Sequence, residues 1–90
     1  MKRLEIIANH SVQSEITSLF DILFPELGYT LMPAVLGKGR SGNRRGDSVW
    51  PETNFCVFTY CSEEQADTLT KAVSSVKESF PREGIKLFMI

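Results

Sequence analysis

The 90-residue sequence predicts an α+β protein of the ferredoxin-like βαββαβ class. Two stretches repeat apolar residues every three or four positions, as on one side of a helix, and four shorter stretches are rich in residues that favour strands. For this element order the expected solution is an antiparallel sheet with strand order 4-1-3-2 and both helices on one face. A chain of this length is sufficient for one core, so we expect residues 1–90 to form a single domain.

The first strand and the first helix are predicted from the first quarter of the chain. Residues 2–8 alternate apolar and polar side chains, which is typical of a strand with one buried face. Asn9 and Ser11 follow, and both side chains can accept hydrogen bonds from the free N–H groups of a helix start. The helix should end near Phe24, because a residue that precedes proline disfavours the helical conformation.

The second and third strands are predicted to occupy different places in the sheet. Residues 29–36 favour a strand but contain Pro33, which cannot donate a ladder hydrogen bond and therefore indicates an edge position. Residues 54–61 are almost continuously apolar, so this strand should be central and covered on both faces. Cys56 and Cys61 lie on it at an odd spacing, so we expect two buried thiols on opposite faces.

The last third of the chain predicts a second helix and a final strand. Ser62 and Gln65 have the spacing of a capping box, and Pro81 with Gly84 should end the helix. Residues 85–90 are apolar on both faces of the expected strand. Because two helices cover only one face of the sheet, we expect the other face to pack against other copies of the chain.

Composition excludes two broad classes. An apolar fraction of 42% and a charged fraction of 23% are ordinary for a globular protein, so a disordered chain is not indicated. No stretch approaches the ~20 apolar residues of a membrane-spanning helix, and the N-terminus has no apolar region of the signal-peptide type. We therefore expect a cytoplasmic protein.

Residues 37–54 are the basic part of a mildly acidic chain. They carry four cations and two acids, whereas the whole chain has a net charge of −1. With no helical or alternating period, they are predicted to form a long loop between the second and third strands, and such loops in small domains are often functional. The charge favours an anionic ligand or partner at the loop without indicating a general nucleic-acid-binding protein.

The start of this loop contains a glycine motif, Gly-x-Gly-x-x-Gly, that runs from Gly37 to Gly42. The motif is not a dinucleotide-binding fingerprint, because no helix is predicted to open after it, and the lysine of a P-loop is missing. Glycines still let backbone N–H groups approach an anion closely, and Lys38 and Arg40 supply charge and donors. Gly37, Lys38, Gly39 and Arg40 are therefore candidate anion-binding residues, and the alternative is a solvated hairpin loop.

The middle of the loop contains residues that favour a macromolecular partner. Arg44, Arg45 and Trp50 are of types that often anchor protein interfaces, and they could also stack on single-stranded nucleic acid. The only histidine, His10, has no acid, nucleophile or second metal ligand at a useful spacing. No enzyme activity and no metal site are therefore expected.

Taken together, the opening strand Met1–Ile7, the Gly-x-Gly-Arg at Gly37 to Arg40 before a long basic loop, and the element order resemble the PII-like signalling proteins, the superfamily of nitrogen regulatory protein PII. The resemblance implies a homotrimer that binds adenine nucleotides or other small effectors in the clefts between subunits. It also implies that the long loop, called the T-loop in the family, regulates a transporter or enzyme. By this resemblance Gly37, Gly39 and Arg40 would hold the phosphates of the ligand, and residues 44–50 would contact the partner.

The chain departs from the family pattern in two places. The second glycine-rich loop of the family is reduced here to residues 81–86, which keep Gly84 and Lys86, so Lys86 joins the candidate ligand residues and the chain would be a short, divergent member. The long loop also lacks the tyrosine that some members have modified with a nucleotidyl group. We expect a non-enzymatic regulator that binds an adenine nucleotide or another small anion. The alternative is an effector-independent module that docks a protein or RNA.

Overall fold

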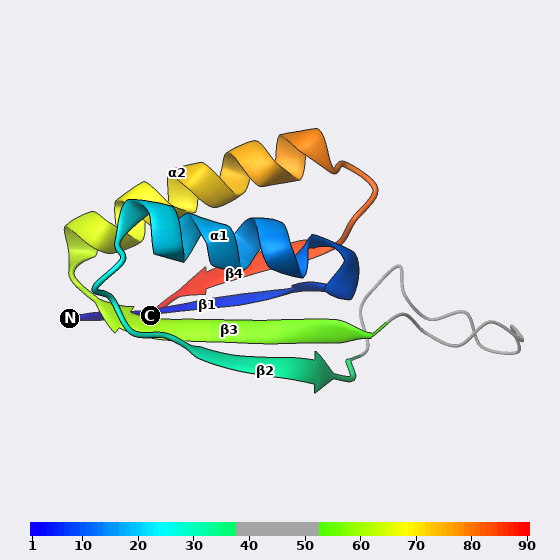
Figure 1. The fold of residues 1–90 in the computed structure, drawn as a ribbon, viewed down its shortest axis with the longest axis horizontal. Helices are drawn as coiled ribbons and strands as arrows, with labels where there is room; N and C mark the ends of the chain where they lie inside the picture. Colours follow the sequence, from blue (N-terminus) through cyan, green and yellow to red (C-terminus); the bar gives the residue numbers. More distant parts are fainter. Residues whose placement is uncertain (38–52) are drawn as a thin grey trace, which may run out of the picture.

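The computed structural model describes residues 1–37 and 53–90 and contains every predicted element in the predicted order (Figure 1). The elements are β1 (Lys2–Asn9), a 3-10 turn η1 (His10–Val12), α1 (Gln13–Leu23), β2 (Thr30–Val35), β3 (Asn54–Cys61), α2 (Glu63–Ser79) and β4 (Ile85–Met89). The four strands form one antiparallel sheet in the order β2-β3-β1-β4. This is the predicted order 4-1-3-2 read from the other edge of the sheet. The predicted fold class and strand order are therefore confirmed.

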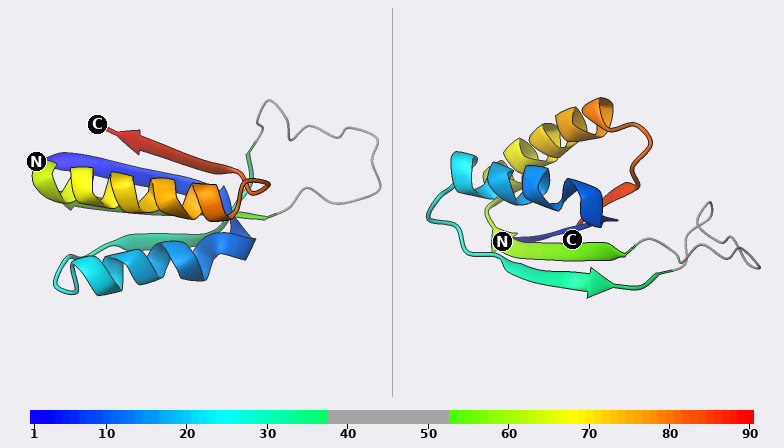
Figure 2. Two further views of the ribbon diagram at one scale, coloured as in Figure 1. Left: turned by 90° about the horizontal axis from the view of Figure 1, so that it is seen from above. Right: turned by 45° about the vertical axis from the view of Figure 1, so that its right-hand side comes forward.

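Both helices cover the same face of the sheet (Figures 1 and 2). Seen from above, α1 lies on the β2 side and α2 lies on the side of β1 and β4. The core between the two layers is apolar because alternate residues of each strand point toward the helices. Its fully buried members include Leu4, Ile6, Phe20, Phe55 and Leu69.

The register of β1 explains why this strand is central. Ile6 lies opposite Val57 of β3 on one side and opposite Leu87 of β4 on the other. All three side chains belong to the core or pack against it. A one-residue slip of β1 would turn Ile6 away from the helices, so the core fixes the register.

The start of α1 differs in detail from the prediction. Asn9 does act as a cap, but for the turn η1, where its Oδ1 accepts a hydrogen bond from the backbone N–H of Ser11 at 2.8 Å. Ser11 therefore takes part through its backbone, and α1 begins only at Gln13, with no side-chain cap on Val12. The predicted end is confirmed, because α1 stops at Leu23 and the residue before Pro25, Phe24, has a non-helical φ of −141°.

The capping box of α2 is confirmed. Ser62 Oγ accepts from the backbone N–H of Gln65 at 3.1 Å, and Gln65 Oε1 accepts from the backbone N–H of Ser62 at 3.0 Å. The two bonds satisfy backbone donors that a helix start leaves free. The helix then ends at Ser79, before Phe80 and Pro81.

β2 lies at an edge of the sheet, as Pro33 predicts. It pairs with β3, and the pairing shifts register between Met32 and Val35, on either side of the proline. The segment before β2 is held by Thr59, whose Oγ1 donates a hydrogen bond to the carbonyl of Gly28 at 2.6 Å. Within the described ranges, no helix is long and apolar enough to cross a membrane.

Candidate functional site

The structure describes two of the predicted site residues, Gly37 and Lys86. The others lie outside the described residues: Lys38, Gly39, Arg40, Arg44, Arg45 and Trp50. The described part of the candidate site therefore consists of Gly37, which follows β2, Thr53, which precedes β3, and Lys86, which belongs to β4.

We call the end of the sheet where β2 stops and β3 begins the loop end; it lies at the right of Figure 1. β1 also ends here, and β4 begins here. Two backbone hydrogen bonds hold the end of β1 on both sides: Asn9 N–H donates to the carbonyl of Gly84 at 3.1 Å, and His10 N–H donates to the carbonyl of Thr53 at 2.9 Å. At the loop end, β1 is therefore tied to the residues that precede β3 and β4.

Gly37 and Lys86 lie on opposite edges of the sheet. Gly37 follows the edge strand β2, Lys86 belongs to the edge strand β4, and β3 and β1 separate them. With neighbouring strands ~4.8 Å apart, three strand spacings separate the two edges by roughly 14 Å across the sheet. The two residues are also offset along the strands, because Lys86 is level with Met32 in the register and Gly37 lies beyond Met32. Contact between a β2 edge of one copy and a β4 edge of another is one arrangement that would bring both residues to a single small ligand.

The side chain of Lys86 is available for such a contact. It is exposed, and because Ile85 and Leu87 on either side of it point toward the helices, Lys86 points to the opposite face of the sheet. Its register partner on β1 is Ile7. A cation thus stands on the outer edge of the sheet face that the helices leave uncovered.

No atom of residues 1–37 and 53–90 crowds the backbone at Gly37. A Cβ built at this position would meet no described atom within 4 Å, and the same holds at Gly28 and Gly84. A glycine in open space does allow a ligand or a neighbouring chain to approach the backbone closely. Gly37 is therefore suited to contact with something outside its own copy.

His10 is a residue whose position the sequence reasoning did not anticipate. It is exposed, and it lies at the loop end between the starts of β3 and β4. Its place directly after the first strand is the signal that could have indicated this. Among the residues that the structure describes, no group of three His, Cys, Asp or Glu side chains lies close enough to hold a metal ion.

The face of the sheet turned away from the helices is called the open face. It carries Arg3, Glu5, Ile7, Met32, Cys56, Phe58, Tyr60, Lys86, Phe88 and Ile90. Four of its apolar or aromatic side chains are largely exposed, at 40% for Met32, 54% for Tyr60, 47% for Phe88 and 74% for Ile90. Exposed apolar side chains gathered on one face are typical of a surface that contacts another molecule.

Arg3 is the centre of the open face. Its guanidinium carbon lies 4.2 Å from the ring centroid of Phe58 and 5.5 Å from that of Tyr60. Its nitrogens donate to Glu5 Oε2 at 3.1 and 2.9 Å and to the hydroxyl of Tyr60 at 2.6 Å. The charge is therefore paired and stacked in each copy, although the sequence analysis assigned it no role.

The two cysteines lie as predicted. Cys56 is on the open face and Cys61 points into the core; both are free and only 4% exposed. Burial raises the pKa of both thiols, which disfavours the reactive thiolate. Neither cysteine is placed as a nucleophile.

Comparison with known proteins identifies the fold. No protein-family model and no curated protein matches the chain. Among solved structures, CPII, a nitrogen regulatory PII-like protein from Thiomonas intermedia K12 bound to ADP, AMP and bicarbonate, matches with a TM-score of 0.74 and 23% identity, over 99% of this chain and 86% of that chain. A PII-like signaling protein from Thermus thermophilus matches with a TM-score of 0.67 and 20% identity, over 99% of this chain and 83% of that chain.

The apo form of CPII also matches, with a TM-score of 0.67 and 20% identity over 99% of this chain and 87% of that chain. The chain therefore has the fold of the PII-like signalling proteins over nearly its whole length. The resemblance inferred from the sequence is confirmed at the level of the fold.

Proposed function

We propose that this protein is a cytoplasmic, non-enzymatic PII-like regulator that binds a small anionic effector between the subunits of a homotrimer. The observation that carries the proposal is the separation of Gly37 and Lys86 on opposite edges of one sheet. Both are candidate ligand residues, and in this proposal they serve one ligand across a contact between copies. The fold it shares with CPII, which is bound to ADP, AMP and bicarbonate, supports the same class of effector.

In this proposal the open face is the surface that joins the copies. Its exposed apolar side chains would be removed from water, and the helix layer on the other side would stay outside the assembly. Three copies would then bring each β2 edge near a β4 edge of a neighbour. Adenine nucleotides and bicarbonate are the first effectors to test.

The basic segment would pass the signal to a transporter or enzyme. Binding at Gly37, Lys38, Gly39 and Arg40 would restrict how Arg44, Arg45 and Trp50 are presented, so the effector would shift a population of states. Changing the last three residues to alanine should then remove partner capture while trimer formation and effector binding persist. Loss of trimers in that variant would contradict the division into an effector site and a partner site.

A thermal-shift titration tests the effector site. An effector at a hundred times its Kd adds ~2.7 kcal/mol of stability, which for so small a domain corresponds to a rise in Tm on the order of 10 °C. ADP, AMP, ATP and bicarbonate should be titrated separately against the wild type. If none of them nor any other small anion raises Tm, the effector-independent docking module replaces this proposal.

A further inference from the structure

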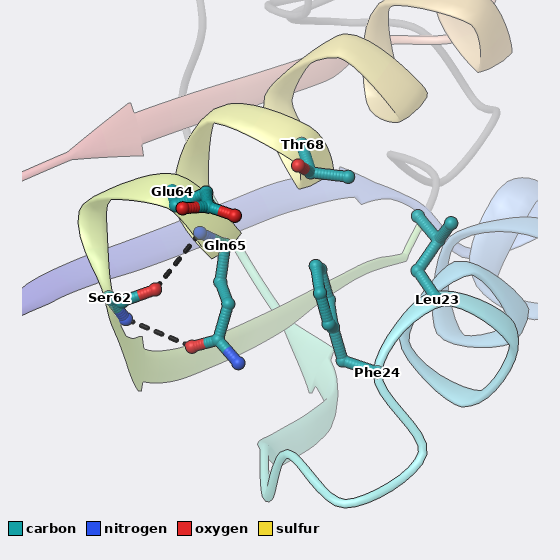
Figure 3. Close-up of a pocket in the computed structure, with 6 residues that line it drawn as sticks. All are labelled: Leu23, Phe24, Ser62, Glu64, Gln65 and Thr68. Carbon is teal, nitrogen blue, oxygen red and sulfur yellow. Dashed lines mark hydrogen bonds between the residues drawn. The ribbon is translucent and has the colours of Figure 1, made fainter.

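A groove lies at the end of the molecule opposite the loop end, between the last turn of α1 and the first turn of α2 (Figure 3). Its volume is about 540 Å³, and its lining residues are Leu23, Phe24, Ser62, Glu64, Gln65 and Thr68. A second hollow of about 420 Å³ continues it past Pro25, Glu26 and Leu27. We call the two together the α1/α2 groove.

The apolar part of the groove comes from α1. Figure 3 shows Leu23 and Phe24 projecting toward α2, with the Phe24 ring between Leu23 and Gln65. Leu23 is 37% exposed, and Ile22 beside it on the same turn is 75% exposed. Leu23 belongs to the apolar side that the period of the first helix predicts, yet α2 leaves it partly uncovered.

Part of the polar lining is already engaged. In the capping box Ser62 Oγ and Gln65 Oε1 each accept a backbone N–H, which leaves the Ser62 hydroxyl and the Gln65 side-chain NH2 as donors. The apolar surface of α1 and the charges around the rim are the further contacts that the groove offers.

The rim is acidic. Residues 11–37 and 53–70 contain no lysine or arginine. Glu64 and Glu26 are exposed and line the groove, and the exposed acids Asp21, Glu63 and Asp67 lie on the adjoining turns of α1 and α2. Cations at this end of the molecule are Lys2, which lies opposite Cys61 in the sheet, and the N-terminal amino group, whose charge acts on Cys61; Lys71 lies further along α2.

The two helix ends at the groove carry opposite partial charges. The C-terminus of α1 is negative and has no basic residue in its last turn, whereas the N-terminus of α2 is positive and has Glu63 and Glu64 in its first turn. The preference for a cation therefore comes from the acidic side chains and from the α1 end.

We propose that the α1/α2 groove docks a segment of a partner protein in which a bulky apolar side chain is flanked by lysines or arginines. The apolar side chain would cover Leu23 and Phe24, and the cations would face Glu26 and Glu64. The groove is on the helix layer, so it would remain open when the open face is covered by other copies. This inference is independent of the proposed effector site.

Charge disfavours a membrane as the occupant, and geometry disfavours the basic segment of this chain. An anionic membrane surface would be repelled by the rim. The basic segment of this chain leaves the sheet between Gly37 and Thr53, at the opposite end from the groove. If one copy inserted that segment into the groove of the next, the contact would be head-to-tail, and such contacts form open filaments unless their rotation closes a ring.

Peptide binding to the full-length protein tests the proposal. The probes are three dye-labelled synthetic peptides: one with tryptophan between pairs of lysines, one with alanine in place of the tryptophan, and one with glutamates in place of the lysines. Fluorescence anisotropy should show binding of the first, about tenfold or more weaker binding of the other two, and weakening as salt is raised. Equal affinity for the tryptophan and alanine peptides, or no binding of the first, would overturn the proposal.

Variants locate the binding on the protein. Glu26→Lys and Leu23→Asn should each weaken binding of the tryptophan peptide several-fold, and because both residues are exposed the fold should persist. Glu78→Lys, the same charge reversal at the far end of α2, is the matched control and should bind as the wild type does. If Glu78→Lys weakens binding as much as Glu26→Lys, the attraction is one of net charge and the groove is not the site.

One further probe decides the source of the occupant. A peptide with the sequence of residues 36–54 should bind the groove more weakly than the tryptophan and lysine peptide, because it also carries Asp47 and Glu52. If it binds more tightly and Glu26→Lys removes that binding, the occupant is a second copy of this chain and the assignment to a partner protein is wrong.

Discussion

Arg3 and Glu5 form an ion pair on the open face of the sheet, with 2.9 Å between Arg3 Nη2 and Glu5 Oε2. Residues two positions apart on a strand share a face, so the pair forms within β1 of each copy and needs no neighbour. The side chains are still 30% and 24% exposed. If another copy covered the open face, Arg3 would be buried together with Glu5, the carboxylate that already neutralises it.

Glu5→Gln should weaken the proposed assembly. The substitution leaves Arg3 without its carboxylate on a surface that assembly removes from water, and an unpaired buried charge is strongly unfavourable. Analytical ultracentrifugation should show dissociation at concentrations where the wild type forms the proposed trimer. Replacing both residues by leucine is the contrast: it should preserve assembly, and equal dissociation of the double variant would argue against this explanation.

Phe88→Asp should dissociate the copies more completely. Phe88 is 47% exposed and lies opposite Glu5 in the register. An aspartate at position 88 would place a second carboxylate beside that of Glu5. Light scattering should report a monomer. Ile22→Asp makes the same chemical change on the helix layer and should leave the mass unchanged; if it dissociates the protein as well, the open face is not the assembly surface.

Mixing two inactive variants should restore effector binding. Arg40→Ala and Lys86→Ala each remove one of the two edges that the proposed site combines, so each homotrimer should lose the effector-induced rise in Tm. In trimers reassembled from both variants, a copy with Lys86→Ala still has Arg40 and a copy with Arg40→Ala still has Lys86. Where these two copies meet in the right order, one contact contains both residues. Binding measured by calorimetry should therefore reappear after mixing.

The same experiment can contradict the site. If either single variant binds as the wild type does, the altered residue does not hold the effector. If both fail and mixing restores nothing although mixed trimers are detected by mass spectrometry, the two residues act in the same copy or only on folding.

Thr59→Val should destabilise each copy by about 1–3 kcal/mol, because it leaves the carbonyl of Gly28 without its 2.6 Å hydrogen bond. Thr59 is only 2% exposed, and valine has nearly its shape, so the loss should come from the bond and not from packing. Urea unfolding measures the change. Thr68→Val, at an exposed position of α2, should change stability by less than about 0.5 kcal/mol.

Ser62→Ala should cost about 1 kcal/mol through the loss of the N-cap of α2. Gln65→Ala removes only the reciprocal bond to the backbone of Ser62 and should cost less. Thermal unfolding followed by circular dichroism can compare the two. A larger effect at Gln65 would mean that its contact with the α1/α2 groove matters more to stability than the capping box does.

The described part of the chain also shows which features could be predicted locally. The C-terminal end of α1 follows from Pro25, and the start of α2 follows from the pair Ser62 and Gln65. Both could be predicted because helix termination and capping involve residues within one turn. The exception is the start of α1, where Asn9 caps a 3-10 turn first. Both Asn9 and Ser11 offered an acceptor there, and the sequence could not decide which one the backbone would reach.

By itself the sequence determined the element order, the edge position of the Pro33 strand and the faces of the two cysteines, because these depend on periods and spacings within single segments. Only the tertiary structure decided that Gly37 and Lys86 stand on opposite edges, that Arg3 stacks on Phe58, and that α2 leaves Leu23 uncovered. Each of these joins residues from different strands or helices. Their proximity is set by strand order, register and helix packing, which arise from the burial of the whole core and not from any one stretch of the chain.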